Sequence, residues 1–95
     1  MTINATFQPD IDRAVTILKD GGCSEIFLFG SLAEGRAHEN SDIDLAVRGC
    51  PSGAFFSLYG KLMGELQHRV DLVKLDTTDP FAQFLLEHGE LLRVG

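Results

Sequence analysis

Apolar residues recur at the spacing of an amphipathic helix in three segments of the chain, over residues 10–20, 55–66 and 80–88. Positions three, four and seven residues apart lie on one face of a helix, so each segment is expected to pack one side against a core. The positions on these faces are Ile11, Ala14, Val15 and Leu18; Phe55, Leu58, Leu62 and Leu66; and Phe81, Phe84, Leu85 and His88.

The predicted helices are bounded by residues that commonly begin or end a helix. Asp79 and Pro80 are a typical start, because an aspartate side chain caps free N–H groups and proline suits the first helical position. The glycine pair at 21–22 ends the first helix, and Gly89 ends the last. One further helical turn is expected at residues 32–35.

Short apolar runs predict strands between these helices. The run at 26–29 is continuously apolar, which is typical of a strand covered on both faces. Residues 43–47 and 70–75 predict two more strands, and residues 91–94 a short last one. Helices and strands alternate without a linker or repeat, so we expect a single α/β domain over residues 1–95, an α+β arrangement with a small mixed sheet flanked by helices.

Composition and charge narrow the class of protein. The 95 residues carry a net charge of −6, which argues against a nucleic-acid partner, because Lys and Arg contacts to phosphate dominate such binding. An acidic chain suits a basic protein partner or a metal-bridged anion, and it is equally compatible with a merely soluble surface. No apolar run approaches the roughly 20 residues of a membrane span, and no secretory signal is visible, so we expect a cytoplasmic protein without membrane contact.

The two cysteines, Cys23 and Cys50, are far apart in sequence and lack a CxxC spacing. In a cytoplasmic protein this pattern predicts two reduced thiols used for packing or placed in loops, without redox or zinc chemistry.

Two aspartates in an apolar strand are the first sign of a functional site. Asp42 and Asp44 are two residues apart, so on a strand their carboxylates share a face. Like charges repel at that distance, and a bound cation removes the conflict; Mg²⁺ prefers such oxygen ligands. The alternative for this motif alone is a surface turn at Ser41-Asp42.

Two further features strengthen this interpretation. Gly30 and Ser31 follow a buried strand and precede a helical turn, where backbone N–H groups hold anions; the alternative is an ordinary turn with Ser31 as helix cap. Asp71 interrupts another apolar strand. The alternative interpretation of Asp71 alone is an exposed charge on an edge strand. Taken together, a phosphate-binding turn and three strand carboxylates predict a two-metal phosphoryl-transfer site.

The spacing Gly30-Ser31, ten residues, Asp42-Ile43-Asp44 resembles the G-S-x10-D-x-D signature of minimal nucleotidyltransferases, in the DNA polymerase β-like nucleotidyltransferase superfamily. The resemblance covers the whole chain and implies that superfamily's fold. It implies that Gly30 and Ser31 hold the triphosphate of ATP, that Asp42 and Asp44 bind two Mg²⁺ ions, and that Asp71 completes the second metal site and helps to activate an acceptor hydroxyl.

The phosphate turn departs from the family pattern at one position. Family members often carry a basic residue inside the turn, where this chain has Glu34. Arg36 follows instead, and we expect Arg36 and Ser41 to contribute to nucleotide binding beside the glycine-serine pair.

The resemblance also implies a partner. Minimal nucleotidyltransferases are typically antitoxins paired with a HEPN-domain toxin, and can transfer AMP from ATP to a toxin tyrosine. We therefore expect a protein adenylyltransferase in a hetero-oligomer, with Asp42, Asp44 and Asp71 as catalytic residues. Two alternatives stay open: an antitoxin that neutralises its partner by binding alone, and a nucleotidyltransferase that acts on a small hydroxyl compound with a separate helical subunit.

Overall fold

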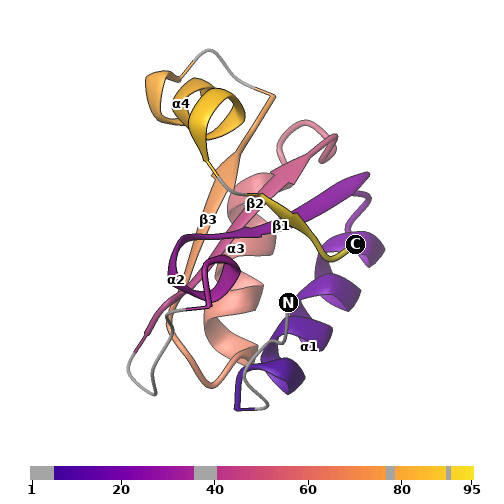
Figure 1. Cartoon of the computed structure of the whole chain (residues 1–95). Coiled ribbons are helices and arrows are strands. Elements are labelled where there is room, and N and C mark those ends of the chain that lie inside the picture. The colour runs from indigo at the N-terminus through magenta and orange to yellow at the C-terminus, as the bar shows by residue number, and fades with distance from the viewer. Residues whose placement is uncertain (1–5, 36–40, 77–78, 90) are drawn as a thin grey trace.

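The computed structural model describes residues 6–35, 41–76, 79–89 and 91–95 of the chain (Figure 1). Its elements follow the predicted order of helices and strands. They are α1 (Gln8–Asp20), β1 (Glu25–Phe29), α2 (Gly30–Ala33), β2 (Ile43–Arg48), α3 (Phe55–Glu65), β3 (Val70–Lys74), α4 (Pro80–His88) and β4 (Leu92–Arg93). Among the described residues, no helix has the length and apolar character that a membrane span requires.

The four strands form one mixed sheet in the order β3-β2-β1-β4. β1 pairs antiparallel with both β2 and β4, whereas β2 and β3 are parallel. Parallel neighbours need a crossover, and α3 provides it between β2 and β3. The predicted mixed sheet is therefore confirmed, and β3 lies at one of its edges.

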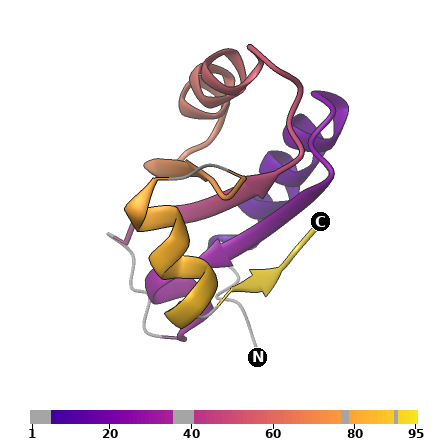
Figure 2. The same ribbon diagram turned by 90° about the horizontal axis from the view of Figure 1, so that it is seen from above.

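The sheet separates two clusters of buried side chains, and Figure 2 shows helices on both of its faces. One face packs on α1 and α3, and its core includes Ile11, Leu28, Leu45 and Leu62. The other face carries α4, and Leu85 of that helix packs with a smaller cluster on this side of the sheet. Helices on both faces explain why β1 and β2 read as almost continuously apolar sequences.

Two helices differ in detail from their predictions. The short helix α2 begins at Gly30, two residues earlier than expected, because the chain turns directly out of β1 there with φ of +72° at Gly30. The apolar face predicted for α4 is only partly buried: Leu85 is in the core, but Phe81 and Phe84 are 49% and 57% exposed. The predicted cap of α4 is confirmed, since Asp79 accepts a hydrogen bond from the Phe81 N–H.

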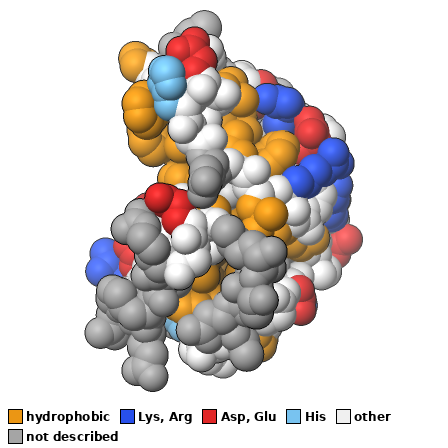
Figure 3. Space-filling view, in the orientation of Figure 1, with side chains coloured by type: hydrophobic (Ala, Val, Ile, Leu, Met, Phe, Trp, Pro, Cys, Tyr) orange, Lys and Arg blue, Asp and Glu red, His pale blue; other side chains and the backbone are white. Residues whose placement is uncertain are grey.

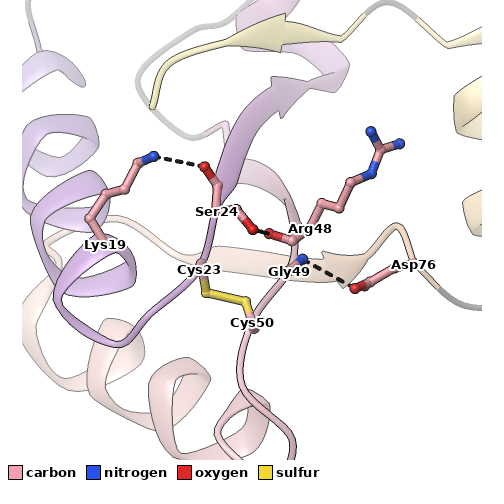
Figure 4. Close-up of a disulfide and its surroundings, with 7 residues drawn as sticks. All are labelled: Lys19, Cys23, Ser24, Arg48, Gly49, Cys50 and Asp76. Carbon is pink, nitrogen blue, oxygen red and sulfur yellow. Dashed lines mark hydrogen bonds between the residues drawn. A yellow bond between two sulfur atoms is a disulfide. The ribbon is translucent and has the colours of Figure 1, made fainter.

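The prediction that the cysteines are separate thiols is wrong in this structure. Cys23 and Cys50 form a disulfide, with Cα atoms 3.9 Å apart (Figure 4). Cys23 lies just before β1 and Cys50 just after β2, and the antiparallel pairing of these strands brings the two residues together. Their large separation in sequence therefore concealed a short separation in space.

Candidate active site

The sheet register brings the predicted carboxylates to one end of the sheet. Asp44 in β2 is the direct partner of Phe29, the last residue of β1, and of Asp71 in β3. Residues paired across adjacent strands point to the same face and are separated by about one strand spacing, roughly 4.8 Å. Asp42 precedes β2 by one residue, so only Asp44 and Asp71 are held by strand geometry.

These two carboxylates lie on the α4 side of the sheet. Ala46 and Val73 are two residues further along β2 and β3, and both belong to the cluster around Leu85 of α4. Because alternate residues of a strand share a face, Asp44 and Asp71 lie on that same side. They occupy the end of the sheet at which α2 begins.

Gly30 has a specific reason to be glycine. Its φ of +72° is in the left-handed region, and a β-carbon placed on it would lie 2.4 Å from Oδ2 of Asp44. The Gly30-Ser31 turn is thereby packed against the carboxylate of β2. The two halves of the motif, ten residues apart in sequence, thus meet directly.

The carboxyl group of Asp44 is partly buried and lies near two other negatively charged side chains. Burial raises the pKa of its carboxyl group to about 6, with further contributions from the negative charges of Asp71 and Asp42. Asp42 itself has a long ion pair with Arg69, 3.9 Å between Oδ1 and Nε, in which the Arg69 side chain is largely exposed and the Asp42 side chain is partly buried. A cation bound beside Asp44 would relieve this repulsion.

Tyr59 of α3 has a contact that the sequence did not reveal. Its hydroxyl lies 3.2 Å from the backbone oxygen of Val70 and 3.2 Å from Oδ1 of Asp71, and its one proton is shared between these two acceptors. Burial and the bond to Asp71 raise the pKa of the Tyr59 phenol. The ring of Tyr59 packs beside the core, and its hydroxyl reaches the candidate site.

Asp10 is a second residue whose role was missed. It is 7% exposed, and its Oδ2 accepts hydrogen bonds from the N–H groups of Gln67 and His68 and contacts Nδ1 of His68 at 2.8 Å. Burial alone would raise the pKa of Asp10, but these hydrogen bonds outweigh it and lower the pKa. Asp10 therefore holds the loop that leads into β3 and Asp71.

Two of the other predicted site residues, Ser31 and Ser41, lie in the described part of the chain. Ser31 is the second residue of α2, partly buried, and it does not cap the helix, since the chain enters from Phe29. Ser41 is also partly buried and directly precedes Asp42. Arg36 lies outside the described residues, and Glu34 is an exposed residue at the end of α2.

The chemistry of the acidic side chains fits Mg²⁺, although they do not form a complete cage. Asp42 and Asp44 offer carboxylate oxygens of the kind that Mg²⁺ binds, and the raised pKa of Asp44 marks a place where positive charge is favourable. Within the described part of the chain, no three His, Cys, Asp or Glu side chains are grouped closely enough to hold an ion. One oxygen of Asp71 is instead bonded to Tyr59.

A groove of about 450 Å³ opens beside these carboxylates. Asp42 and Asp71 line it, together with Tyr59, Met63 and Arg69. The acidic residues therefore border a space large enough for part of a substrate.

The sequence profile described as polymerase beta nucleotidyltransferase matches residues 12–93 of this chain. The chain belongs to this nucleotidyltransferase family. The match includes the glycine-serine turn and all three aspartates, and the family assignment agrees with the resemblance seen in the sequence and with the fold.

Solved structures of toxin–antitoxin complexes contain similar chains. One complex with AMP-PNP includes a chain 32% identical, with a TM-score of 0.66, covering 85% of this nucleotidyltransferase and 70% of that chain. The MntA-HepT complex includes a chain that is 29% identical, with a TM-score of 0.61; the match covers 88% of this nucleotidyltransferase and 69% of that chain. A complex of a tri-AMPylated Shewanella oneidensis HEPN toxin with an MNT antitoxin includes a chain that is 28% identical, with a TM-score of 0.61. The match covers 88% of this nucleotidyltransferase and 69% of that chain. No curated protein matches the chain.

Proposed function

We propose that this nucleotidyltransferase is the antitoxin of a HEPN-domain toxin and transfers AMP from ATP to a tyrosine hydroxyl of that toxin in a Mg²⁺-dependent reaction. The observation that carries the proposal is the register of Asp44 with Asp71 at the end of the sheet where Gly30 touches Asp44. This register brings the turn proposed to bind phosphate, the oxygens proposed to bind Mg²⁺ and the proposed proton acceptor to one end of the sheet.

The proposed roles follow from position. The backbone of Gly30 and Ser31 binds the triphosphate, and Asp42 and Asp44 hold Mg²⁺, with Asp71 completing the second metal site. When bound, Mg²⁺ supplies positive charge that offsets the charge of the phosphates and of the reacting oxygens. Asp71, exposed on the edge strand, accepts the proton of the acceptor hydroxyl. The acceptor oxygen then bonds to the α-phosphorus, the bond from that phosphorus to the bridging oxygen breaks, and pyrophosphate leaves.

The partner and the acceptor are proposed from the similar structures. Chains of the same family were crystallised with toxins, one complex holds AMP-PNP, and one toxin is tri-AMPylated. The acidic surface of this chain, with a net charge of −6, is compatible with a basic partner.

The test is intact mass spectrometry of the HEPN-domain protein encoded beside this chain, after incubation with the chain, ATP and Mg²⁺. We expect the toxin mass to rise by one or more AMP groups, and no rise with the Asp42→Asn, Asp44→Asn variant. An unchanged mass together with a stable complex contradicts the transfer reaction. That result would favour the second candidate, inhibition by binding alone, which is compatible with the engagement of Asp71 by Tyr59.

A further inference from the structure

The outer edge of β3 is open to another strand. β3 pairs only with β2 among the described strands. Two hydrogen bonds turn residues 69 and 75 toward β2: the Ile43 N–H donates to the Arg69 oxygen, and the Leu75 N–H donates to the Val47 oxygen. Backbone groups alternate in direction along a strand, so Leu72 and Lys74 direct their N–H and C=O groups away from the sheet. Exposed edges of this kind are templates for a further strand.

The Tyr59 hydroxyl occupies the start of this edge and bonds to a backbone oxygen there, as a paired strand would. It shares its one proton between the outward oxygen of Val70 and Asp71. A hydroxyl group can therefore occupy the open edge and touch the Asp71 carboxylate at the same time. The Leu72 N–H also bonds to the Tyr59 hydroxyl, and beyond it the edge at Lys74 pairs with no further strand among those described.

Two grooves follow this edge one after the other. The first, beside the carboxylates, is lined by Arg69, Val70 and Asp71 of the β3 region. The second, of about 530 Å³, is lined by residues 72–74 and by side chains of α3 and α4, including Phe56 and Phe81. Figure 2 shows β3 at the edge of the sheet with α3 on one side and α4 on the other.

The walls of the second groove are unusually apolar for a surface. Phe56 is 83% exposed and Phe81 is 49% exposed, and Met63 of α3, in the first groove, is 62% exposed. Figure 3 shows hydrophobic surface gathered over α4, above a notch in this face of the molecule. Contiguous exposed apolar side chains along a free strand edge are typical of a peptide-binding surface.

We propose that the acceptor segment of the partner protein binds as an added β-strand along the outer edge of β3, between α3 and α4, with its hydroxyl at Asp71. This inference rests on the proposed function, because the groove ends at the candidate active site and its occupant must present the group that reacts there. A nucleotide does not match the second groove, since this groove offers backbone hydrogen bonds and apolar walls and includes no residue of the Gly30-Ser31 turn.

The geometry defines the chemistry of the segment. β3 has five residues, about 17 Å at the rise of a strand, so the segment is extended over a similar length. Its backbone bonds to Leu72 and Lys74, and its side chains alternate between the two walls. The acceptor hydroxyl is therefore accompanied, a few residues away, by apolar side chains that contact Phe56 on one wall and Phe81 on the other.

The first measurement is hydrogen–deuterium exchange of this chain with and without the HEPN-domain protein, without nucleotide. We expect the outward amide of Lys74 to become protected in the complex. Absence of protection there, whether the partner binds elsewhere or not at all, overturns the proposal. Protection without AMP transfer under reaction conditions instead overturns the proposed reaction and leaves the docking site standing.

Paired variants then separate the backbone and side-chain contributions. Lys74→Pro and Lys74→Ala both remove the lysine side chain, but only proline removes the outward N–H, and proline is tolerated on edge strands. We expect the proline variant to bind the partner about tenfold more weakly than the alanine variant. Phe56→Ser should weaken binding by a similar factor, whereas Phe84→Ser, at another exposed phenylalanine that lines neither groove, should not. Equal affinities within each pair, in variants whose unfolding temperatures match, overturn the proposal.

Discussion

A β-carbon placed on Gly30 would lie 2.4 Å from the Oδ2 atom of Asp44, so the glycine-serine turn and the carboxylate of β2 are in direct contact. We expect Gly30→Ala to reduce stability by more than the roughly 1–2 kcal/mol of left-handed strain, because Asp44 must also move. On the proposed function, ATP and Mg²⁺ stabilise the natural chain against heat, and the Gly30→Ala variant should lose this thermal shift.

Gly35 provides a matched control for that variant. Its φ of +73° is the same, but a β-carbon there meets no atom within 4 Å. Gly35→Ala should therefore show only the strain, and it should retain the ATP-dependent shift. Urea unfolding and thermal shift measure both properties, and equal losses in the two variants would show that contact with Asp44 is unimportant.

The pKa of Asp44, raised by burial and then by Asp71 and Asp42 from 3.8 to about 6, predicts a pH dependence. Between these two values the folded state binds more protons than the unfolded state, so this group makes stability fall as the pH rises from 3.8 to about 6, and the loss is complete above that range. Asp44→Asn should remove this slope in urea unfolding with EDTA present. Asp20→Asn, an exposed position at the end of α1, controls for the loss of one charge and should leave the slope in place.

The bond from Tyr59 to Asp71 predicts an effect on metal dependence. The phenol competes with a metal ion for a carboxylate oxygen, at 3.2 Å from Oδ1. Tyr59→Phe should therefore lower the Mg²⁺ concentration needed for half-maximal AMP transfer by a few-fold, while reducing stability by about 1 kcal/mol through the lost hydrogen bonds. An unchanged Mg²⁺ dependence would mean that Asp71 reaches the metal without leaving Tyr59.

Asp10 should be a major contributor to stability, although it does not touch the candidate site. Removing its side chain leaves the N–H groups of Gln67 and His68 without their acceptor, so we expect Asp10→Ala to cost about 3 kcal/mol in urea unfolding. Because the pKa of Asp10 is lowered, its contribution is fully present above its ordinary value of 3.8 and is lost as the pH falls below it. A natural-like stability of the variant at neutral pH would contradict this role.

The Cys23–Cys50 disulfide encloses β1, the glycine-serine turn and β2, with a sequence separation of 27 residues. By the chain-entropy account, closing a loop of this length stabilises the folded state by about 3–4 kcal/mol. Dithiothreitol should therefore lower the unfolding temperature of the natural chain to that of the Cys23→Ser, Cys50→Ser variant, and should not affect the variant. Insensitivity of the natural chain to reductant would show that the bond does not form in solution.

The local patterns of the sequence were sufficient for the elements and for the location of the motif. Hydrophobic period and capping residues act within a few positions, so the helix after Asp79 and the strand at Ile43 could be predicted without any tertiary contact. The spacing of Gly30 and Ser31 from Asp42 and Asp44 likewise indicated a nucleotidyltransferase, and the family match agrees with it.

Only the tertiary structure decided how distant positions meet. The pairing of Cys23 with Cys50, the contact of Tyr59 with Asp71 and the anchoring of His68 by Asp10 all join residues whose sequence separation carries no local signal. The same holds for β3 as an edge strand, which depends on sheet order and leaves Asp71 exposed beside Asp44. The sequence thus determined which chemical groups are present and on which elements they lie. Strand register and helix packing decided which of them share a site, because these depend on contacts between residues far apart along the chain.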